Sequence, residues 1–377
     1  MQVFMDGRML YKSGIGRYIR NVMQETMKMD ENLNYLLAGE QGEFSRFVEE
    51  LPSPHLRLQI KPAKYEQDIY TVGEQIRGSF LTLKYRAADV FFYPHYNAPR
   101  FLSSNSIVTV HDLIHFRLPQ YYNRPKLLLA RQVLGNALKR AGRIIVISHS
   151  TADDLIAMFP GLPAGKIQVV YQGVSPFFNP APAVDIKRLK KRWGLGCYIL
   201  YVGARKPHKN LGRLVKAWLN LLYDKPGLQL VICGERSDQK DEIDIVKEKY
   251  KPEGLVEISG LTDGELKVLY SGAEAFVFPS LCEGFGLPPL EAMACGTPVI
   301  AAAASSLPEV IGEAGTYFNP YNIEEIGQQI YRILKDTEER ERLVKNGALR
   351  AKEFRWETTA RETLEIIRQV AQDFKRR

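Results

Sequence analysis

Short runs of apolar residues alternate along the chain with longer segments in which apolar residues recur at helical spacing. The short runs predict buried strands, whereas the 3.6-residue period of Arg17–Met29 and Lys126–Arg140 predicts amphipathic helices. Strands that alternate with helices indicate a parallel α/β architecture. In the first half the predicted strands are Val3–Met5, Tyr35–Ala38, Asp89–Tyr93, Ile107–Val110, Arg143–Ile147 and Ile167–Tyr171.

The alternation stops once, at the proline-rich segment Pro176–Pro182, and then begins again. The pattern therefore predicts two Rossmann-like, doubly wound domains, 1–180 and 181–357. Ligands of such sheets bind beyond the carboxyl ends of the strands, so two of them in series are expected to face a central cleft. In the second domain the predicted strands are Tyr198–Val202, Leu228–Cys233, Val256–Ser259, Ala275–Phe278 and Pro298–Ala302.

Composition narrows the class of protein without naming an activity. The 377 residues are 45% hydrophobic and 25% charged, and no apolar stretch is long enough to span a bilayer. The N-terminus has no signal-peptide pattern and reads as a first strand. Four cysteines without a C-x-x-C pair argue against a zinc site or a disulfide framework, so we expect a cytoplasmic protein.

The net charge of +8 is uneven, because residues 1–180 carry 21 Lys and Arg against 15 Asp and Glu. A basic first half suits anionic lipid head groups or other polyanions, although a solvated surface of ordinary imbalance explains it equally well. No nucleic-acid recognition motif is present and the basic residues are scattered, so we do not expect nucleic-acid binding.

The segment Phe278–Val299 carries the most specific pattern of the chain. It reads as a strand, a glycine-rich loop, a helix with prolines in its first turn, and a glycine stop. Glu283 then lies on the loop and Glu291 on the helix, and backbone N–H groups between them face a positive helix end. This arrangement predicts a diphosphate site flanked by two hydroxyl-binding acids, with amides from Phe285, Gly286 and Leu287.

This glutamate pair, with Phe-Gly between its members and a helix that ends in Cys-Gly-Thr-Pro-Val, resembles the signature of the retaining GT-B glycosyltransferases of family 4. The resemblance runs through most of the chain and is strongest over residues 198–311. It implies that Glu283 contacts hydroxyls of the donor sugar and that Glu291 binds the ribose. It also implies that a terminal helix of about 358–377 packs back on the first domain.

A second motif follows the strand Tyr198–Val202. Arg205 and Lys209 lie on the loop after this strand, where they would ordinarily form a solvated basic surface. Beside the glutamate segment they match the family's Arg and Lys pair, which implies that they neutralise the leaving diphosphate. The chain has no Asp-x-Asp pair, so we expect a transferase without a metal and without a cofactor other than the donor substrate.

Two candidates lie in the first half of the chain. Gly14-Ile15-Gly16 resembles the family's flexible glycine loop, with Gly16 facing the donor phosphates; Ile19 at the third small position argues against a dinucleotide fingerprint. His111 follows a predicted strand, and the resemblance implies that its imidazole or its carbonyl acts near the reacting carbon. Asp112 beside it is expected to bind the donor or to cap the next turn.

The opening Met5-Asp6-Gly7-Arg8 and the His-Asp-Leu loop look like those of bacterial surface-polysaccharide enzymes, some of which use GDP-mannose. We therefore expect a retaining transferase that moves a hexose, mannose favoured, from a nucleotide-diphosphate sugar to a saccharide or lipid-linked acceptor, at the inner face of the membrane. The alternatives are a nucleotide-sugar epimerase or a sugar phosphorylase of the same fold, a dinucleotide-dependent oxidoreductase, and a non-catalytic nucleotide-sugar-binding subunit.

Overall fold

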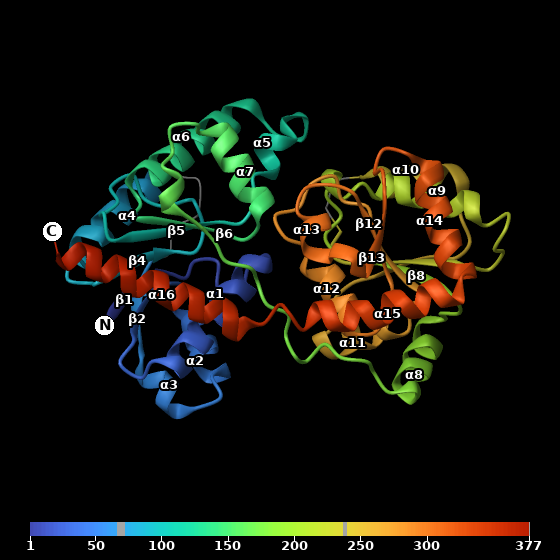
Figure 1. The fold of residues 1–377 in the computed structure, drawn as a ribbon, viewed down its shortest axis with the longest axis horizontal. Coiled ribbons are helices and arrows are strands. Elements are labelled where there is room, and N and C mark those ends of the chain that lie inside the picture. Colours follow the sequence, from blue (N-terminus) through green and yellow to red (C-terminus); the bar gives the residue numbers. More distant parts are fainter. Residues whose placement is uncertain (66–71, 237–239, 377) are drawn as a thin grey trace. The chain divides into compact units, whose positions relative to one another are not determined.

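The computed structural model describes residues 1–65, 72–236 and 240–376, which form two compact units (Figure 1). Unit 1 contains Met1–Gly173 and Arg355–Arg377, and unit 2 contains Val174–Phe354. The sequence analysis placed residues 174–180 in the first domain. In the structure they belong to unit 2. The return to unit 1 begins at Arg355 rather than at about 358.

Unit 1 is built on a parallel sheet of seven strands in the order β3-β2-β1-β4-β5-β6-β7. The central strands β4 and β5 are buried along their length because helices cover both faces of the sheet, which explains why β5 reads as an unbroken run of buried residues. The seven strands are β1 (Gln2–Asp6), β2 (Asn34–Gly39), β3 (Ile60–Lys64), β4 (Val90–Tyr93), β5 (Ser106–Val110), β6 (Arg143–Val146) and β7 (Ile167–Val169).

Helices of unit 1 pack on the two faces of this sheet. On one face α1 and α16 lie side by side (Figure 1), and α4, α6 and α7 pack on the other face. Side chains of β1 alternate between these two faces. Val3 and Met5 pack in the core under α1 and α16, and Phe4 packs in the core under α4, α6 and α7. The helices are α1 (Ser13–Met29), α2 (Gln41–Glu50), α3 (Pro54–Leu58), α4 (Val72–Lys84), α5 (Ile114–Arg117), η1 (Pro119–Tyr121), α6 (Arg124–Arg140), α7 (His149–Met158), η2 (Ala164–Lys166) and α16 (Trp356–Lys375).

Unit 2 has a parallel sheet of six strands in the order β10-β9-β8-β11-β12-β13. The strands are β8 (Tyr198–Val202), β9 (Gln229–Cys233), β10 (Leu255–Ile258), β11 (Ala275–Phe278), β12 (Val299–Ala302) and β13 (Gly315–Phe318). The helices are α8 (Ala183–Trp193), η3 (Pro207–Lys209), α9 (Leu211–Leu221), α10 (Glu242–Tyr250), α11 (Asp263–Ser271), α12 (Leu287–Ala294), α13 (Leu307–Ile311), η4 (Gly312–Ala314), α14 (Ile323–Lys335) and α15 (Thr337–Ala351).

Among the residues that the structure describes, no helix combines the length and the apolarity needed to cross a lipid bilayer. The longest helix, α16, is amphipathic instead. Its buried side chains, among them Trp356, Leu364 and Ile367, belong to the core that α1 and β1 form. Residues more than 300 positions from the first strand thus complete the core of unit 1.

Removing part of this contact is expected to destabilise unit 1 selectively. Ile367 is fully buried, so Ile367→Ala should lower the free energy of unfolding by about 2–5 kcal/mol, through lost burial and the cavity that remains. Differential scanning calorimetry should show a lower melting transition for unit 1 and an unchanged one for unit 2. Leu349→Ala on α15, where the side chain is exposed, is the matched control. An unchanged transition of unit 1 would show that α16 is not part of its core.

Candidate active site

The sheet of unit 2 reverses its strand order between β8 and β11. The chain leaves β8 toward one side of the sheet and β11 toward the other, so the loops after these two strands lie next to each other at the carboxyl edge. Ligands of open α/β sheets bind at such a point. The loop after β8 carries Lys209 and the loop after β11 carries Glu283, so the fold brings together two residues that are 74 positions apart.

Asn210 fastens these loops to one another. Its side-chain amide donates to the carbonyl of Pro279 at 3.0 Å and to the carbonyl of Pro320 at 2.8 Å. Asn210 has a φ of 59°, in the left-handed region that asparagine tolerates better than most residues. The N–H of Leu281 adds a backbone bond of 2.8 Å to the carbonyl of His208. The position of Lys209 relative to the second loop is therefore set by its neighbours on both sides.

Lys209 and Glu283 form an ion pair, with Nζ 2.6 Å from Oε1. Both side chains are largely buried, and the ammonium also lies 5.3 Å from the centre of the Phe278 ring. The pair leaves two of the three ammonium hydrogens available for another acceptor. Burial also lowers the pKa of the adjacent His208 to about 4, so this imidazole is neutral at pH 7 and Lys209 is the cation that faces Glu283.

Two serines that the sequence analysis did not single out hold the glutamate loop in place. The N–H of Glu283 donates to Oγ of Ser305 at 2.8 Å. The hydroxyl of Ser306 donates to the carbonyls of Glu283 and Phe285, at 3.0 and 2.9 Å. Ser305 has a φ of 47°, in the left-handed region that few residues other than glycine adopt. Such a conformation marks a tight turn, and this turn places the Ser305 hydroxyl against the loop that carries Glu283.

The amides of the predicted diphosphate site lie at the N-terminus of α12. Gly286, the residue before the helix, has a φ of 110°, and a Cβ atom there would lie 2.9 Å from Leu307 Cδ2. In the described part of the chain, the N–H groups of Gly286 and Leu287 donate to no acceptor. Two prolines follow, which removes further N–H groups from the first turn. The Phe285 side chain packs against Phe354, so its contribution to a ligand is limited to the backbone.

Glu291 lies one turn into α12 and is buried. The hydroxyl of Tyr270 on α11 donates to its Oε2 at 3.0 Å. A carboxylate held at this depth accepts hydrogen bonds and has little freedom to move, which suits the recognition of a hydroxyl pair on a ligand.

Arg205 lies among acidic side chains of unit 2. Its guanidinium forms a bidentate pair with Asp241, at 2.6 and 2.5 Å, and also bonds Glu257 at 2.8 Å and Asp244 at 3.2 Å. Burial alone would raise the pKa of Asp241, but pairing with Arg205 brings it below its ordinary value. Because three carboxylates surround the guanidinium, Arg205 anchors the loop after β8 to α10 and β10. A contact with the donor phosphates would require the guanidinium to leave some of these partners.

In unit 1, His111 lies at the carboxyl end of β5 with both ring nitrogens in hydrogen bonds. Nε2 is 2.8 Å from the carbonyl of Pro94, and Nδ1 is 3.3 Å from the amide nitrogen of Gln172. The carbonyl can only accept, so Nε2 carries the proton and Nδ1 accepts from the amide. Burial lowers the pKa of His111, and the imidazole is therefore a neutral link between β4, β5 and residue 172.

The sequence analysis expected Gly16 in a flexible loop. In the structure it lies in the first turn of α1. Its N–H donates to the carbonyl of Lys12 at 3.0 Å, and a Cβ atom at this position would lie 2.5 Å from the carbonyl of Leu10. Glycine is required there because α1 packs directly on the backbone that leaves β1. The Asp112 carboxylate accepts from the N–H of Ile114 at 3.2 Å, which is the capping role that the sequence left open.

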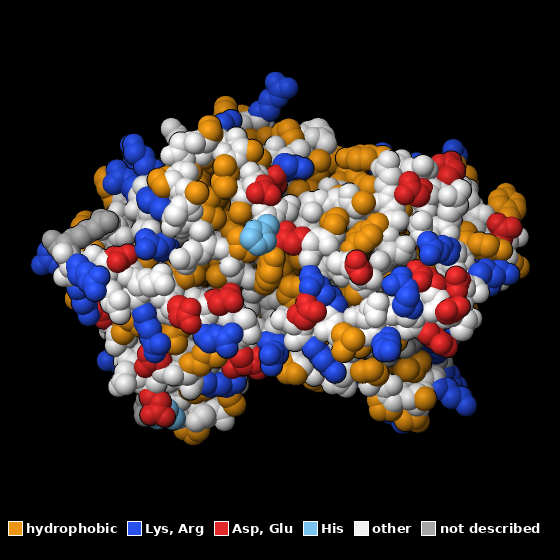
Figure 2. Space-filling model, in the orientation of Figure 1, with side chains coloured by type: hydrophobic (Ala, Val, Ile, Leu, Met, Phe, Trp, Pro, Cys, Tyr) orange, Lys and Arg blue, Asp and Glu red, His pale blue; other side chains and the backbone are white. Residues whose placement is uncertain are grey.

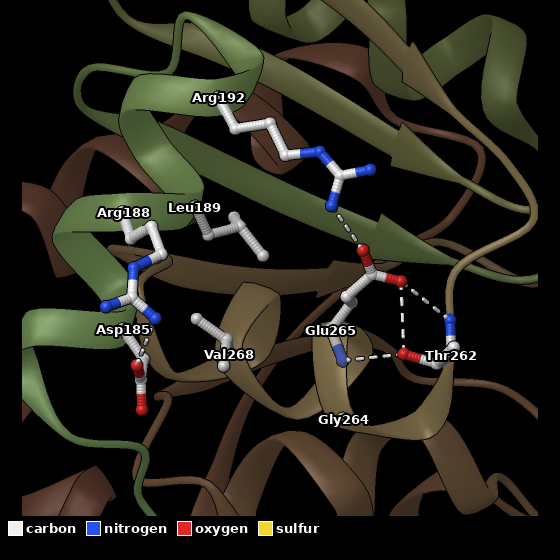
Figure 3. A pocket seen from close by; sticks show the side chains of 8 residues that line it. All are labelled: Asp185, Arg188, Leu189, Arg192, Thr262, Gly264, Glu265 and Val268. Carbon is white, nitrogen blue, oxygen red and sulfur yellow. Dashed lines mark hydrogen bonds and ion pairs between the residues drawn. The ribbon is translucent and has the colours of Figure 1, made fainter.

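A cavity of about 330 Å³ lies elsewhere in unit 2, between α8 and α11 (Figure 3). Arg192 of α8 pairs with Glu265 of α11 at 2.6 Å, and Glu265 also closes the capping box with Thr262. None of the predicted site residues lines this cavity. Its ion pair joins two helices, and we assign it a structural role.

Within the described residues, no cluster of three His, Cys, Asp or Glu side chains could hold a metal ion. The positive groups gathered at the carboxyl edge of unit 2 are instead the Lys209 ammonium and the N-terminus of α12. Whether the reaction needs a divalent ion stays a prediction for experiment.

Two family models match this chain. A model described as Glycosyltransferase Family 4 matches residues 12–176, and one described as Glycosyl transferases group 1 matches residues 189–350. Together they cover most of both units. The second match contains both loops of the site and the whole of α12.

Relatives and a solved structure extend the match. The chain is 30% identical to O-antigen chain mannosyltransferase B of Escherichia coli, over 73% of each protein. It is 31% identical to O-antigen chain mannosyltransferase RfbU of Salmonella typhimurium, over 60% of this chain and 59% of that protein. The crystal structure of Anabaena Alr3699/HepE in complex with UDP and glucose superposes with a TM-score of 0.77 at 16% identity, over 98% of this chain and all of that one. The chain therefore belongs to family 4 of the glycosyltransferases, has the GT-B fold and is a glycosyltransferase.

Proposed function

We propose that this enzyme transfers mannose from GDP-mannose to a saccharide or lipid-linked acceptor, with retention of configuration, in the synthesis of a bacterial surface polysaccharide. The relatives that are named mannosyltransferases of O-antigen chains support the sugar and the pathway class. The complex of a structural neighbour with UDP and glucose supports a nucleotide-sugar donor.

The observation that carries the proposal is the contact between Lys209 and Glu283 next to the unpaired amides of Gly286 and Leu287. A pyrophosphate bound at the N-terminus of α12 would receive these two backbone donors and the Lys209 ammonium. Glu283 would then accept from hydroxyls of the donor sugar, and Glu291, deeper on the same helix, would accept from the ribose. Buried acids that flank a positive centre fit a sugar nucleotide better than a free anion.

The proposed mechanism depends on the charges that develop on the donor as its glycosidic bond to phosphate breaks. As the bond between the sugar C1 and the phosphate oxygen breaks, negative charge grows on the leaving diphosphate and positive charge grows on the sugar ring. Lys209 and the two amides stabilise the leaving group more strongly in this transition state than in the ground state. The acceptor oxygen attacks C1 from the face that the phosphate leaves, and a phosphate oxygen takes the acceptor's proton.

We propose that three residues of unit 1, namely His111, Gly16 and Asp112, also contribute to the reaction. Both nitrogens of His111 are already engaged, so its backbone carbonyl, and not the imidazole, is the group we assign near the reacting carbon. Gly16 contributes through the N-terminal turn of α1, where positive backbone dipoles converge. Asp112 keeps its capping bond with the N–H of Ile114, and a contact between its carboxylate and the donor stays a prediction.

The first test is a panel of nucleotide sugars. A ligand that binds only the folded protein raises the melting temperature by mass action, so GDP-mannose should give the largest shift among GDP, UDP and ADP sugars. Transfer to a mannosyl acceptor should then be followed by mass spectrometry and the anomeric product by NMR, with and without EDTA. We expect equal rates in EDTA. Conversion of the donor sugar without acceptor would indicate an epimerase, and binding without turnover a non-catalytic subunit.

Lys209 should be needed for turnover. Lys209→Met is expected to lower kcat by about a hundred- to a thousandfold, since one well-placed electrostatic donor contributes roughly 3–4 kcal/mol to transition-state stabilisation. Lys206→Met, an exposed lysine on the same loop, is the matched control and should retain its rate. Equal rates for the two variants would contradict the proposed role of Lys209, provided that both variants melt like the parent.

Arg205 should contribute stability rather than phosphate binding. Arg205→Met is expected to lower the free energy of unfolding of unit 2 by about 2 kcal/mol, less than for a fully buried pair, because Asp241 and Glu257 keep partial hydration. We expect kcat to fall by less than about tenfold. Urea unfolding and steady-state kinetics measure both. A hundredfold loss of kcat with unchanged unfolding would instead assign Arg205 to the phosphates.

A further inference from the structure

One layer of unit 1 presents an unusual outer surface. The layer consists of α4, α6 and the segment 97–102 that lies between them. The N–H of Phe101 donates to Oγ of Ser79 on α4 at 3.4 Å, and the amide of Asn136 on α6 donates to the carbonyl of Arg100 at 2.9 Å. Since this segment contacts both helices, the three pieces form a continuous surface over the sheet. We call it the α4–α6 face.

Large apolar side chains are exposed along this face. On α4, Ile76, Phe80 and Leu83 follow helical spacing and are 63–69% exposed, so they form a stripe that points away from the core. On α6, Leu128 is 72% exposed and Leu129 lies next to it. Further exposed apolar residues of this part of the chain are Phe101, Tyr121 and Tyr122. A stripe of this size on a protein surface usually marks a docking surface.

The charge of the chain is concentrated in the same stretch. Residues 75–152 contain eleven Lys and Arg but two acids, Asp89 and Asp112, so this stretch carries a net charge of +9, one more than the +8 of the whole chain. Two of the eleven, Arg117 and Arg143, form ion pairs with acids; in the described part of the chain the other nine do not. Figure 2 shows hydrophobic and basic side chains intermingled over the upper part of unit 1, in the region of α6.

A second feature at the end of this face has the same chemistry. A cavity of about 350 Å³ opens between η1, α6 and α7. Its walls are apolar, with Phe116, Leu127 and Phe159 among them, and Arg124 and Arg131 provide its two charges. Apolar walls beside guanidinium groups suit a chain that carries an anionic head group.

We propose that the α4–α6 face docks on the surface of an anionic lipid bilayer. Aliphatic and aromatic side chains that project from a basic surface enter the boundary between head groups and acyl chains, while Lys and Arg attract anionic head groups. An acidic protein partner would match the charge too, but binding to it would not depend on the anionic lipid content of a vesicle. This inference deepens the proposed use of a lipid-linked acceptor, and it is tested by binding rather than by turnover.

The test is co-sedimentation of the full chain with large unilamellar vesicles. Vesicles of equal parts phosphatidylglycerol and phosphatidylcholine should bind the protein, and vesicles of phosphatidylcholine alone should bind at least about tenfold less. Raising the salt from about 50 mM to about 500 mM should weaken binding, because screening shortens the reach of surface charges. Equal binding to both vesicle types, or binding to neither, would overturn the proposal.

Two double variants separate the contributions. Leu128→Ser with Leu129→Ser should lower the partition coefficient at both salt concentrations, by about tenfold or more. Arg124→Gln with Lys126→Gln should lower it by a similar factor at low salt, and should weaken the salt dependence without abolishing it, because nine of the eleven basic side chains of this stretch remain. The matched controls are Leu349→Ser and Lys345→Gln, both exposed on α15 of unit 2, and they should bind like the parent.

All variants change exposed side chains, so their urea unfolding should match that of the parent and confirm that folding is intact. Light scattering without lipid gives an independent readout. If the parent forms a dimer that Leu128→Ser with Leu129→Ser dissociates, the face is an interface between copies of the chain, and the lipid proposal is wrong. Vesicle binding that survives both double variants would also overturn it.

Discussion

The candidate site of unit 2 depends on two hydrogen bonds from the side-chain amide of Asn210. They reach the carbonyls of Pro279 and Pro320, and so they hold the loops that leave β8, β11 and β13 at one point. Both acceptors are backbone groups next to proline, where the chain has little freedom to shift away. The Lys209 ammonium is paired with Glu283 in the structure. Both side chains are therefore preorganised, which lowers the entropy cost of binding a ligand.

Most of the architecture could be predicted from the hydrophobic pattern, and the elements that escaped prediction share a cause. The strands that were missed are β3 and β13, both at sheet edges. β3 contains Pro62 and three exposed residues, and β13 is mostly half-buried, so neither shows the apolar run of a central strand. The start of α1 was predicted too late, because glycines at its N-terminus read as a loop when their packing partners are unknown.

The part of the candidate site that lies on a single loop and the helix after it could be predicted from the sequence. Glu283, the following glycines and Glu291 lie within a single strand-loop-helix unit, so local rules of helix termini were enough to suggest an anion site. The partners of Arg205 were not predictable in this way, since Asp241 and Glu257 are 36 and 52 residues distant and a guanidinium binds carboxylates and phosphates with the same geometry. The serines that support the loop belong to the turn after β12, where no sequence pattern marked them.

The position of α16 has a consequence for how the protein is made. The chain leaves unit 1 after Gly173 and re-enters it at Arg355, and the N–H of Val174 meets the carbonyl of Phe354 at 2.9 Å, so unit 2 is an insertion whose ends touch. During translation, unit 2 is therefore complete while unit 1 still lacks the helix that covers α1. The sheet of unit 1 already has its seven strands, but one of its faces stays partly uncovered until α16 has been synthesised, and that interval is when aggregation or chaperone capture can occur.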